Sequence, residues 1–591
     1  MHVGVDTGGT FTDVVTEDGT VAKVPSTPDD PGAAVRGVVA GLGGRRPAVL
    51  AHGTTVATNA LLEGTGAPVA LISSAGLRDV IEIGRQDRPA LYDTRVVRPT
   101  PLVPRSLRLE VAGRVAADGT ELEPLGPVPE IPAEAEAVAV CLLHADLHPR
   151  HEAALAEALR AAGYDVSCSH EVSPEVREAE RTSTTVVNAV LRPRCRGYLR
   201  GLAGVADEVL VMTSAGGLLP VEEAAELPAA LLLSGPAGGV RAGAAAAVAN
   251  GFPDAITFDM GGTSTDVCLV LGGVPAPAAQ RSVGGHPVRF PSLDVHTIGA
   301  GGGSIAALDP GGALVVGPAS AGADPGPACY GRGGTQPTVT DADLVAGRIP
   351  AGASFGGLRL DPARAVDALA RAGITAEGVI TVVDAAMERA LRRVSVERGV
   401  DPRGLALVAF GGAGPLHACA LADALDMAAV VVPAHAGVLS ALGILTAERR
   451  RDLVRSWAWP LDHDGVGDAL RRLGQKAAAL VGPGARVETA VDCRYAGQSH
   501  EITVPRPTDF HAAHRRQNGF DRPDSPVEVV ALRASASLVS QVDTSGLPVR
   551  TSHGGAGPTT IVEPDCTIWV PEGWRAEPGA GGALVLRRSG R

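Results

Sequence analysis

Lysine is nearly absent from this sequence, which has two lysines, Lys23 and Lys476, among its 591 residues. A Walker-type phosphate loop needs a lysine directly after a glycine-rich turn, in the pattern G-x-x-x-x-G-K-[ST]. Neither lysine stands in that pattern. The sequence therefore excludes a Walker-type nucleotide site.

Basic clusters and long apolar runs are absent as well. The net charge is −13 and no run of five or more Lys or Arg occurs, so the positive footprint that a nucleic-acid backbone requires is missing. No apolar run reaches the ~20 residues of a membrane span, and the N-terminus shows no leader-like pattern. We expect a chain that binds neither nucleic acid nor membrane.

The eight cysteines form no C-x-x-C pair, which argues against a structural zinc site. Cysteines spread in this way are typical of reduced, mostly buried thiols. We therefore expect a cytoplasmic protein. The length of 591 residues exceeds the ~250–300 at which one core stops growing, so several domains are expected.

One motif occurs twice. Residues 6–13 read DTGGTFTD and residues 259–266 read DMGGTSTD, so both fit D-x-G-G-T-x-T-D. A short β-branched run precedes each copy and another follows it, ending in a turn pair at 18–19 or 272–273. One copy alone is better explained as an ordinary tight turn. Two copies in the same strand–turn–strand setting indicate a duplicated α/β unit around a central cleft.

The motif suits a phosphate group that carries a metal ion. Glycines let the backbone approach a phosphate and turn N–H groups toward it, while threonine hydroxyls add donors. Carboxylates would repel bare phosphate, so their natural partner is Mg²⁺. We assign phosphate binding to Gly8, Gly9, Thr10, Gly261, Gly262 and Thr263. We assign metal binding to Asp6, Asp259 and Asp266. Of these, Asp6 and Asp259 are also the predicted catalytic pair.

Three further features supply candidate contacts for a nucleotide or a substrate. An apolar run, the turn GGAG at 411–414 and a Pro-first helix start could pack against a nucleotide, which makes Gly411, Gly412 and Gly414 candidate contacts. His52 and Asn59 bracket a threonine-rich stretch that a strand end and helix cap explain equally well. His296 precedes a glycine-rich insert at 299–337, whose length favours a functional role.

Together these features resemble the actin/Hsp70/sugar-kinase superfamily and, more narrowly, the A-type subunits of the hydantoinase/oxoprolinase family, which include the nucleotide-binding subunits of acetone and acetophenone carboxylases. The resemblance is carried by residues 4–14, 52–63, 173–188, 233–240, 258–267, 296–304, 320–344 and 410–419.

The resemblance implies an α/β fold with duplicated ATPase domains around a central cleft and a smaller, strand-rich C-terminal domain. We place the domains at 1–180, 181–450 and 451–591. The stretch 546–562 is shorter than the resemblance leads us to expect.

The same resemblance implies a function. ATP with Mg²⁺ would phosphorylate the carbonyl oxygen of a cyclic amide or imide, and a separate hydantoinase B-type subunit would complete ring opening. His52, Asn59 and His296 become candidate substrate contacts. Two alternatives stay open, namely the nucleotide-binding subunit of an ATP-dependent ketone carboxylase and an Hsp70-like ATPase acting on a partner protein. No sequence feature identifies the substrate.

Overall fold

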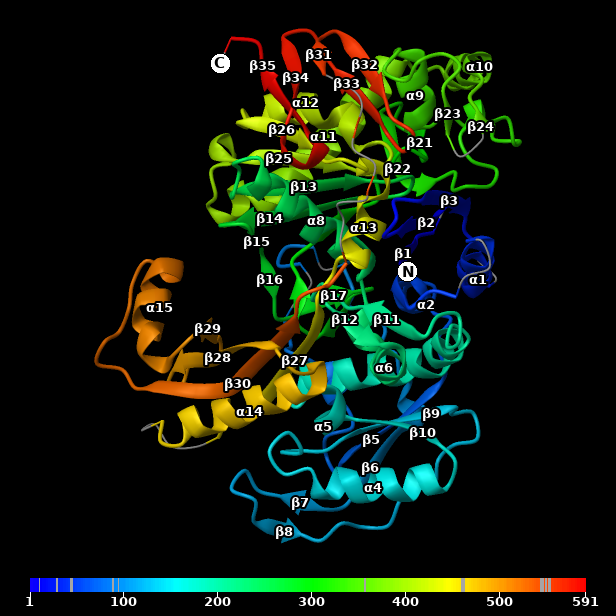
Figure 1. Ribbon diagram of the computed structural model, residues 1–591. Coiled ribbons are helices and arrows are strands. Elements are labelled where there is room, and N and C mark those ends of the chain that lie inside the picture. Colours follow the sequence, from blue (N-terminus) through cyan, green and yellow to red (C-terminus); the bar gives the residue numbers. More distant parts are fainter. Residues whose placement is uncertain are drawn as a thin grey trace.

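The computed structural model describes residues 1–590 except 10, 28–29, 43–45, 88–89, 94, 356–357, 459–462, 543–546, 548–549 and 551–553. Three sheets follow one another along the long axis of the molecule (Figure 1). A nine-stranded sheet lies at the end that holds the C-terminus, a ten-stranded sheet lies in the middle, and a four-stranded sheet lies at the other end.

The ten-stranded sheet carries the first motif, in the strand order β29-β28-β30-β27-β12-β11-β4-β1-β2-β3. β1 pairs parallel with β4 and antiparallel with β2, so Asp6 lies opposite Gly53 on one side and Asp13 on the other. The strands are β1 (His2–Thr7), β2 (Phe11–Thr16), β3 (Val21–Pro25), β4 (Val49–Thr54), β11 (Glu208–Met212), β12 (Leu218–Pro220), β27 (Arg449–Ser456), β28 (Arg486–Tyr495), β29 (Ile502–Val504) and β30 (Val527–Leu538).

The nine-stranded sheet carries the second motif in the same local arrangement. β13 pairs antiparallel with β14 and parallel with β25, so Asp259 lies opposite Asp266 and Phe410. Every residue of β25 and β26 is buried, as expected for central parallel strands. The strands are β13 (Ala255–Met260), β14 (Thr265–Leu271), β15 (Val274–Pro275), β20 (His296–Ile298), β25 (Ala406–Phe410), β26 (Ala429–Val432), β31 (Gly555–Ala556), β34 (Trp574–Pro578) and β35 (Leu584–Arg588).

The four-stranded sheet is parallel throughout, in the order β10-β9-β5-β6. Its strands are β5 (Val69–Ser74), β6 (Arg108–Val111), β9 (Ala137–Cys141) and β10 (Asp165–Cys168). Side chains of β9 alternate between the faces, so Ala137 and Ala139 pack toward helix α6 and Val138 and Val140 toward helix α4. Helices therefore cover both faces of this sheet.

Short strand pairs complete the β-structure. They are β7 (Arg114–Val115) with β8 (Glu121–Glu123), β16 (Pro277–Ala278) with β19 (Ser292–Leu293), β17 (Arg281–Val283) with β18 (His286–Val288), β21 (Ser304–Leu308) with β22 (Leu314–Ser320), β23 (Ser354–Phe355) with β24 (Leu358–Arg359), and β32 (Thr559–Val562) with β33 (Thr567–Val570).

Fifteen α-helices are found in the described residues. They are α1 (Pro31–Gly41), α2 (Val56–Leu62), α3 (Val80–Ile83), α4 (Arg150–Ala161), α5 (Ser169–Val172), α6 (Glu178–Arg200), α7 (Val221–Glu226), α8 (Gly235–Ala249), α9 (Val339–Val345), α10 (Pro362–Ala372), α11 (Ala376–Val394), α12 (Gly414–Ala424), α13 (Leu439–Leu445), α14 (Val466–Val481) and α15 (Phe510–Asn518). None of them is long and apolar enough to span a membrane.

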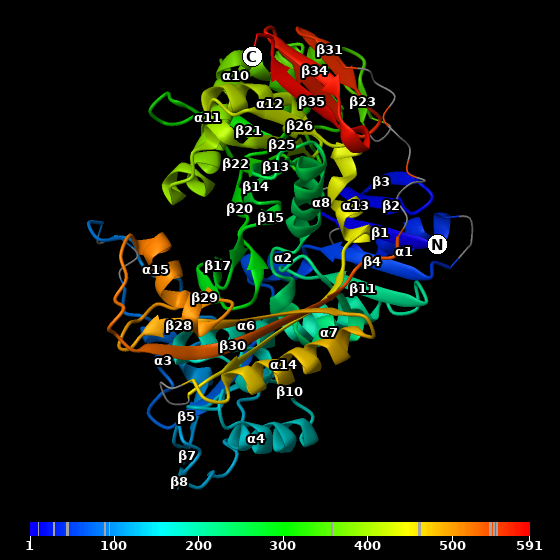
Figure 2. The ribbon, with the colours of Figure 1, turned by 60° about the vertical axis from the view of Figure 1, so that its left-hand side comes forward.

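Helices α8 and α13 join the two motif-bearing sheets. They pack side by side between the sheets (Figure 1 and Figure 2). Glycines allow a very close approach, because a Cβ atom at Gly443 would lie 2.0 Å from the Gly238 carbonyl oxygen. A Cβ atom at Gly238 would in turn lie 2.7 Å from the Ser440 carbonyl oxygen. The separation of the two sheets therefore depends on this glycine contact.

The local sequence predictions are confirmed where they can be checked. Both motifs form strand–turn–strand units. Residue spacing in the sequence also predicts helices at 153–162, 181–202, 379–398 and 415–425, and these are α4, α6, α11 and α12, with ends shifted by a few residues. All eight cysteines are free and buried, as expected. The cytoplasmic location stays a prediction.

The domain boundaries near 180 and 450 stay a prediction too, and strand pairing crosses the second of them. β27, β28, β29 and β30 extend the ten-stranded sheet, while β31, β34 and β35 extend the nine-stranded sheet. The strand-rich C-terminal region thus contributes to both large sheets.

We expect Gly443→Ala to lower the free energy of unfolding by about 1–3 kcal/mol, because the added methyl group overpacks the contact with Gly238. Gly467→Ala on the exposed side of α14 is the control, since a Cβ there meets nothing nearer than 3.9 Å. That change should be neutral or stabilise by up to ~1 kcal/mol. Thermal and urea unfolding would measure both, and an unchanged Gly443→Ala protein would contradict the packing argument.

Candidate functional site

A cavity of about 220 Å³ is lined by residues from both large sheets. Ten of the predicted site residues line it, namely Asp6, Gly8, Gly9, Asp259, Gly261, Gly262, Thr263, Asp266, Gly411 and Gly412. Thr10 lies outside the described residues. The fold therefore brings two motifs that are about 250 positions apart in the sequence to one pocket.

The two glycine turns have matching geometry. The Gly8 N–H donates to the Phe11 carbonyl at 3.0 Å, and the Gly261 N–H donates to the Ser264 carbonyl at 3.1 Å. These residues occupy the same positions in the two copies of the motif. The turns are thus equivalent in structure as well as in sequence, and each presents backbone at the pocket wall.

The first residues of the glycine-rich insert form hydrogen bonds to the glycine turn of the second motif. The Gly302 N–H donates to the Gly261 carbonyl at 3.0 Å, and the Gly303 N–H donates to the Gly262 carbonyl at 2.6 Å. A Cβ atom at Gly301 would lie 2.7 Å from the Thr263 nitrogen, so only glycine fits this contact. The start of the insert therefore holds the turn in place.

Four carboxylates share the pocket, and their pKa values are raised. Burial, followed by repulsion from Asp13 and Asp259, raises the pKa of Asp6 to about 8. Burial and then repulsion from Asp266 raise the pKa of Asp259 to about 7. Burial raises the pKa of Asp266 to about 6, against the hydrogen bond from Thr297. Burial also raises the pKa of Asp13, while Lys23 opposes that rise.

The polar neighbours of these carboxylates are few. The buried Oδ1 atom of Asp6 has no hydrogen-bond partner within the described chain. Asp259 accepts a long hydrogen bond, 3.4 Å, from the Ser440 hydroxyl of α13. Asp13 accepts from the Lys23 ammonium at 2.7 Å. An acidic pocket with an unpartnered oxygen atom suits a hard cation.

The glycine turn that begins at Gly411 lines the pocket beside the second motif. Gly411 has φ +79°, and a Cβ atom there would lie 2.4 Å from Oδ1 of Asp259. Gly412 also lines the pocket, whereas Gly414 begins helix α12 and is not among the lining residues described. Glycine is thus required at position 411, because its φ is positive and because a side chain there would clash with the Asp259 carboxylate.

The three candidate substrate contacts lie elsewhere. His52 is fully buried, its Nε2 atom is 2.6 Å from the Tyr198 hydroxyl, and burial lowers its pKa to about 4. Asn59 is exposed on α2, one turn beyond the lining residue Thr55. Burial, with the positive charges of Arg393 and Arg398, lowers the pKa of His296. None of the three is among the described residues that line the pocket.

Several lining residues were missed by the sequence reasoning. Asp13 ends the first motif just as Asp266 ends the second, so the repeat itself carried that signal. Lys23 lies directly opposite Asp13 in the β2–β3 pair, which the register of the hairpin could have indicated. Gly235 and Ser440 come from α8 and α13. Gly235 lies in the stretch 233–240 that carries the resemblance, whereas no local signal marks Ser440.

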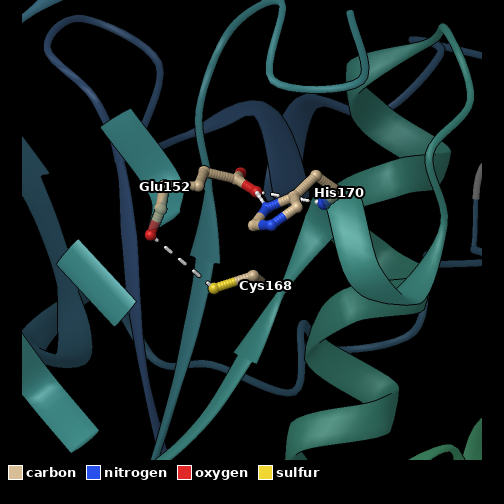
Figure 3. A group of neighbouring side chains, drawn as sticks. All are labelled: Glu152, Cys168 and His170. Atoms are coloured by element: carbon tan, nitrogen blue, oxygen red, sulfur yellow. Dashed lines mark hydrogen bonds and ion pairs between the residues drawn. The ribbon is translucent and has the colours of Figure 1, made fainter. Parts of the chain in front are cut away.

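A second cluster of possible metal ligands lies far along the chain from the motifs. Glu152 from the start of α4, Cys168 from the end of β10 and His170 from α5 come together (Figure 3). The Glu152 carboxylate already accepts hydrogen bonds from Leu142 N–H, the Ser169 hydroxyl, His170 N–H and the His170 ring. These bonds satisfy the carboxylate, so we interpret the cluster as a link that fastens α4 to its sheet.

The two equivalent halves, joined by α8 and α13 and facing one pocket, define the actin/Hsp70/sugar-kinase-like fold class that the sequence predicted. Comparison with known proteins narrows the class. The chain matches the family described as hydantoinase/oxoprolinase at residues 181–453 and that family's N-terminal region at residues 2–163. It belongs to the hydantoinase/oxoprolinase family.

The alpha subunit of the caprolactamase of Pseudomonas jessenii is 38% identical, over 97% of this chain and 97% of that one. The crystal structure of the ATP-dependent caprolactamase from that organism matches with TM-score 0.82 and 34% identity, covering 100% of both chains. The gamma subunit of the acetophenone carboxylase of Aromatoleum aromaticum is 33% identical, over 75% of this chain and 67% of that one. Arabidopsis thaliana 5-oxoprolinase 1 is 33% identical over 79% of this chain but 43% of its own length.

The raised pKa values predict that the free energy of unfolding falls as the pH rises. This holds for protein that a chelator keeps free of divalent cations. Unfolded aspartates release their protons near pH ~4, whereas folded Asp6 and Asp259 release theirs near 8 and 7. The folded state therefore binds more protons between these values, and the stability present below pH ~4 is lost as pH rises through 7 to 8.

Asp6→Asn should reduce the loss of stability between pH 6 and pH 8, because an amide does not titrate there. The unfolding midpoint in urea at the two pH values would measure it. Asp367→Asn, at an exposed position of α10, should leave the wild-type slope unchanged. An Asp6→Asn protein with the wild-type slope would contradict the assignment.

Proposed function

We propose that this chain is the ATP-dependent subunit of a hydantoinase/oxoprolinase-type amidohydrolase, which phosphorylates the carbonyl oxygen of a cyclic amide or imide. One observation carries the proposal. Two equivalent D-x-G-G-T-x-T-D turns, one from each half of the molecule, line the same acidic pocket. The similarity to an ATP-dependent caprolactamase over the whole chain supports it.

The pocket residues fit Mg²⁺ with ATP. Asp6, Asp259 and Asp266 offer carboxylate oxygens, the ligand type that Mg²⁺ prefers, and the unpartnered Oδ1 of Asp6 would gain a partner. When bound, Mg²⁺ would neutralise charge on the phosphates and on the carboxylates around them. Gly411 and Gly412 line the pocket beside the second motif, where they would contact the rest of the nucleotide.

The chain's own groups would position the phosphates and the acceptor. Gly9, Gly262, Thr263 and the N-terminus of α8 at Gly235 line the pocket, so their backbone N–H groups would be the donors to the phosphates. Asp259 would orient the acceptor, because it lines the pocket and the Ser440 hydroxyl holds its carboxylate only by a long hydrogen bond. Catalysis of this kind rests on positioning and charge stabilisation rather than on a protein nucleophile.

The proposed reaction converts the carbonyl oxygen on the ring carbon into part of a phosphate leaving group. The carbonyl oxygen forms a bond to the γ-phosphorus, and the bond from that phosphorus to the bridging oxygen breaks to release ADP. Water then adds to the ring carbon and the ring C–N bond breaks, with a proton passing to the nitrogen, which leaves an acyl phosphate. A second water adds to the same carbon, and the bond from that carbon to the phosphate oxygen breaks. Inorganic phosphate departs with the oxygen that was the carbonyl oxygen.

We propose that a separate hydantoinase B-type subunit completes ring opening. The chain matches 43% of the length of 5-oxoprolinase 1, so more than half of that relative lies outside the match. The caprolactamase relative is itself described as one subunit of its enzyme. The purified chain should then show no full lactam hydrolysis by itself.

A ketone carboxylase subunit is the second candidate. The similarity to the gamma subunit of acetophenone carboxylase favours it. Phosphoryl transfer would then go to an enol oxygen or to bicarbonate. Substrate-stimulated ATP turnover with a panel of lactams and ketones would separate the two.

Asp259→Asn should keep the fold and lower turnover by about 10²–10³-fold, because the charge that orients the acceptor acts mainly in the transition state. ATP turnover in the presence of the stimulating substrate would measure this. Asp367→Asn on α10 is the matched control and should keep the wild-type rate. A folded Asp259→Asn protein with near wild-type turnover would contradict the proposed role.

Heavy-oxygen labelling tests which atom accepts the phosphoryl group. A lactam labelled at its carbonyl should pass the label to inorganic phosphate during turnover with the partner subunit. If water attacked ATP directly, the phosphate would be unlabelled. Unlabelled phosphate from a lactam shown to be opened would reject carbonyl phosphorylation.

A further inference from the structure

The two halves align not only at their turns but across three strands. In the first half, β1 and β2 pair Asp6 with Asp13, and β2 and β3 pair Asp13 with Lys23. The three residues thus form one row across the sheet. The row begins at the strand before the glycine turn and ends at an edge strand.

The second half repeats the row with one difference. β13 and β14 pair Asp259 with Asp266, and β14 and β20 pair Asp266 with Thr297. The Thr297 hydroxyl donates to Asp266 at 2.5 Å, in the place where Lys23 donates to Asp13 at 2.7 Å. The third position of the row is therefore a cation in the first half and a neutral hydroxyl in the second.

Lys23 lies at the pocket rather than on the outer surface. Its Nζ atom also lies 3.4 Å from the Gly437 carbonyl and 5.3 Å from the centre of the Phe11 ring, and all three residues line the cavity. Its side chain is 29% exposed, so it keeps access to the cavity. Among the described lining residues, Lys23 is the one cation beside four carboxylates.

We propose that Lys23 is a further catalytic residue, which contacts a phosphate oxygen of the nucleotide from the wall of the first half while Asp13 positions it. Four carboxylates repel a polyphosphate, and an ammonium group is a compact point charge suited to phosphate. Thr297 cannot supply that charge from the opposite half. The inference rests on the proposed function, because it assumes that a nucleotide occupies the pocket.

The near absence of lysine gives a direct binding test. An amine-directed reagent at low dose can modify Lys23, Lys476 and the N-terminus, and mass spectrometry can follow each site separately. With Mg²⁺ and a non-hydrolysable ATP analogue at ten times its Kd, modification of Lys23 should slow about tenfold. Lys476, exposed on α14, is the internal control and should keep its rate.

Kinetic measurements then distinguish two roles for Lys23. In one it contacts phosphate, and in the other it only neutralises Asp13. Lys23→Met should lower ATP turnover about 10²–10³-fold, and Lys23→Arg should restore part of it, whereas Lys476→Met should have no effect. Lys23→Met combined with Asp13→Asn removes the unpaired carboxylate. If Lys23 contacts phosphate, this double variant stays slow. If it recovers wild-type turnover, Lys23 only neutralises Asp13 and the inference is wrong.

The two proposals can fail separately. Calorimetry that detects nucleotide binding, together with an unprotected Lys23 and normal turnover of Lys23→Met, would overturn this inference alone. Absence of nucleotide binding to the wild-type chain would overturn the proposed function and this inference together.

Discussion

The structure depends on one electrostatic constraint, the enclosure of four carboxylates around a single pocket. Two come from each half of the molecule, and burial raises the pKa values of all four, with repulsion between them adding to the rise at Asp6 and Asp259. Such a group of charges is unfavourable unless cations or donors compensate it. Lys23 and Ser440 compensate part of it, and the proposed Mg²⁺–nucleotide complex would compensate the remainder.

Close backbone contacts keep this pocket in shape. Gly238 and Gly443 let α8 and α13 touch between the sheets, Gly301 lets the insert touch the second turn, and Gly411 lets its own turn pass beside Asp259. At each position a methyl group would meet backbone or carboxylate within 3 Å. Glycine at these positions therefore determines how closely the backbone segments approach one another. It does not add flexibility, because packed backbone has little freedom to move aside.

Duplication explains why two motifs face each other, but the halves are not identical. The turns and the first two carboxylates of each row are equivalent, whereas the third position and the supporting loops differ. A phosphate chain has two chemically different ends, so an asymmetric site can hold it in one direction. The start of the insert adds a support to the turn of the second half through Gly302 and Gly303.

The sequence by itself determined the strand–turn–strand units, the main helices and ten pocket residues, because hydrophobic period, turn chemistry and an internal repeat are local signals. Tertiary structure alone decided that Ser440 joins them, since it comes from a separate segment with no local signal, and it brought Lys23 and Gly235 to the same pocket. It also decided that His52 is buried against Tyr198. Successive side chains of a strand point to opposite faces, so a residue next to the pocket in sequence can face away from it in space.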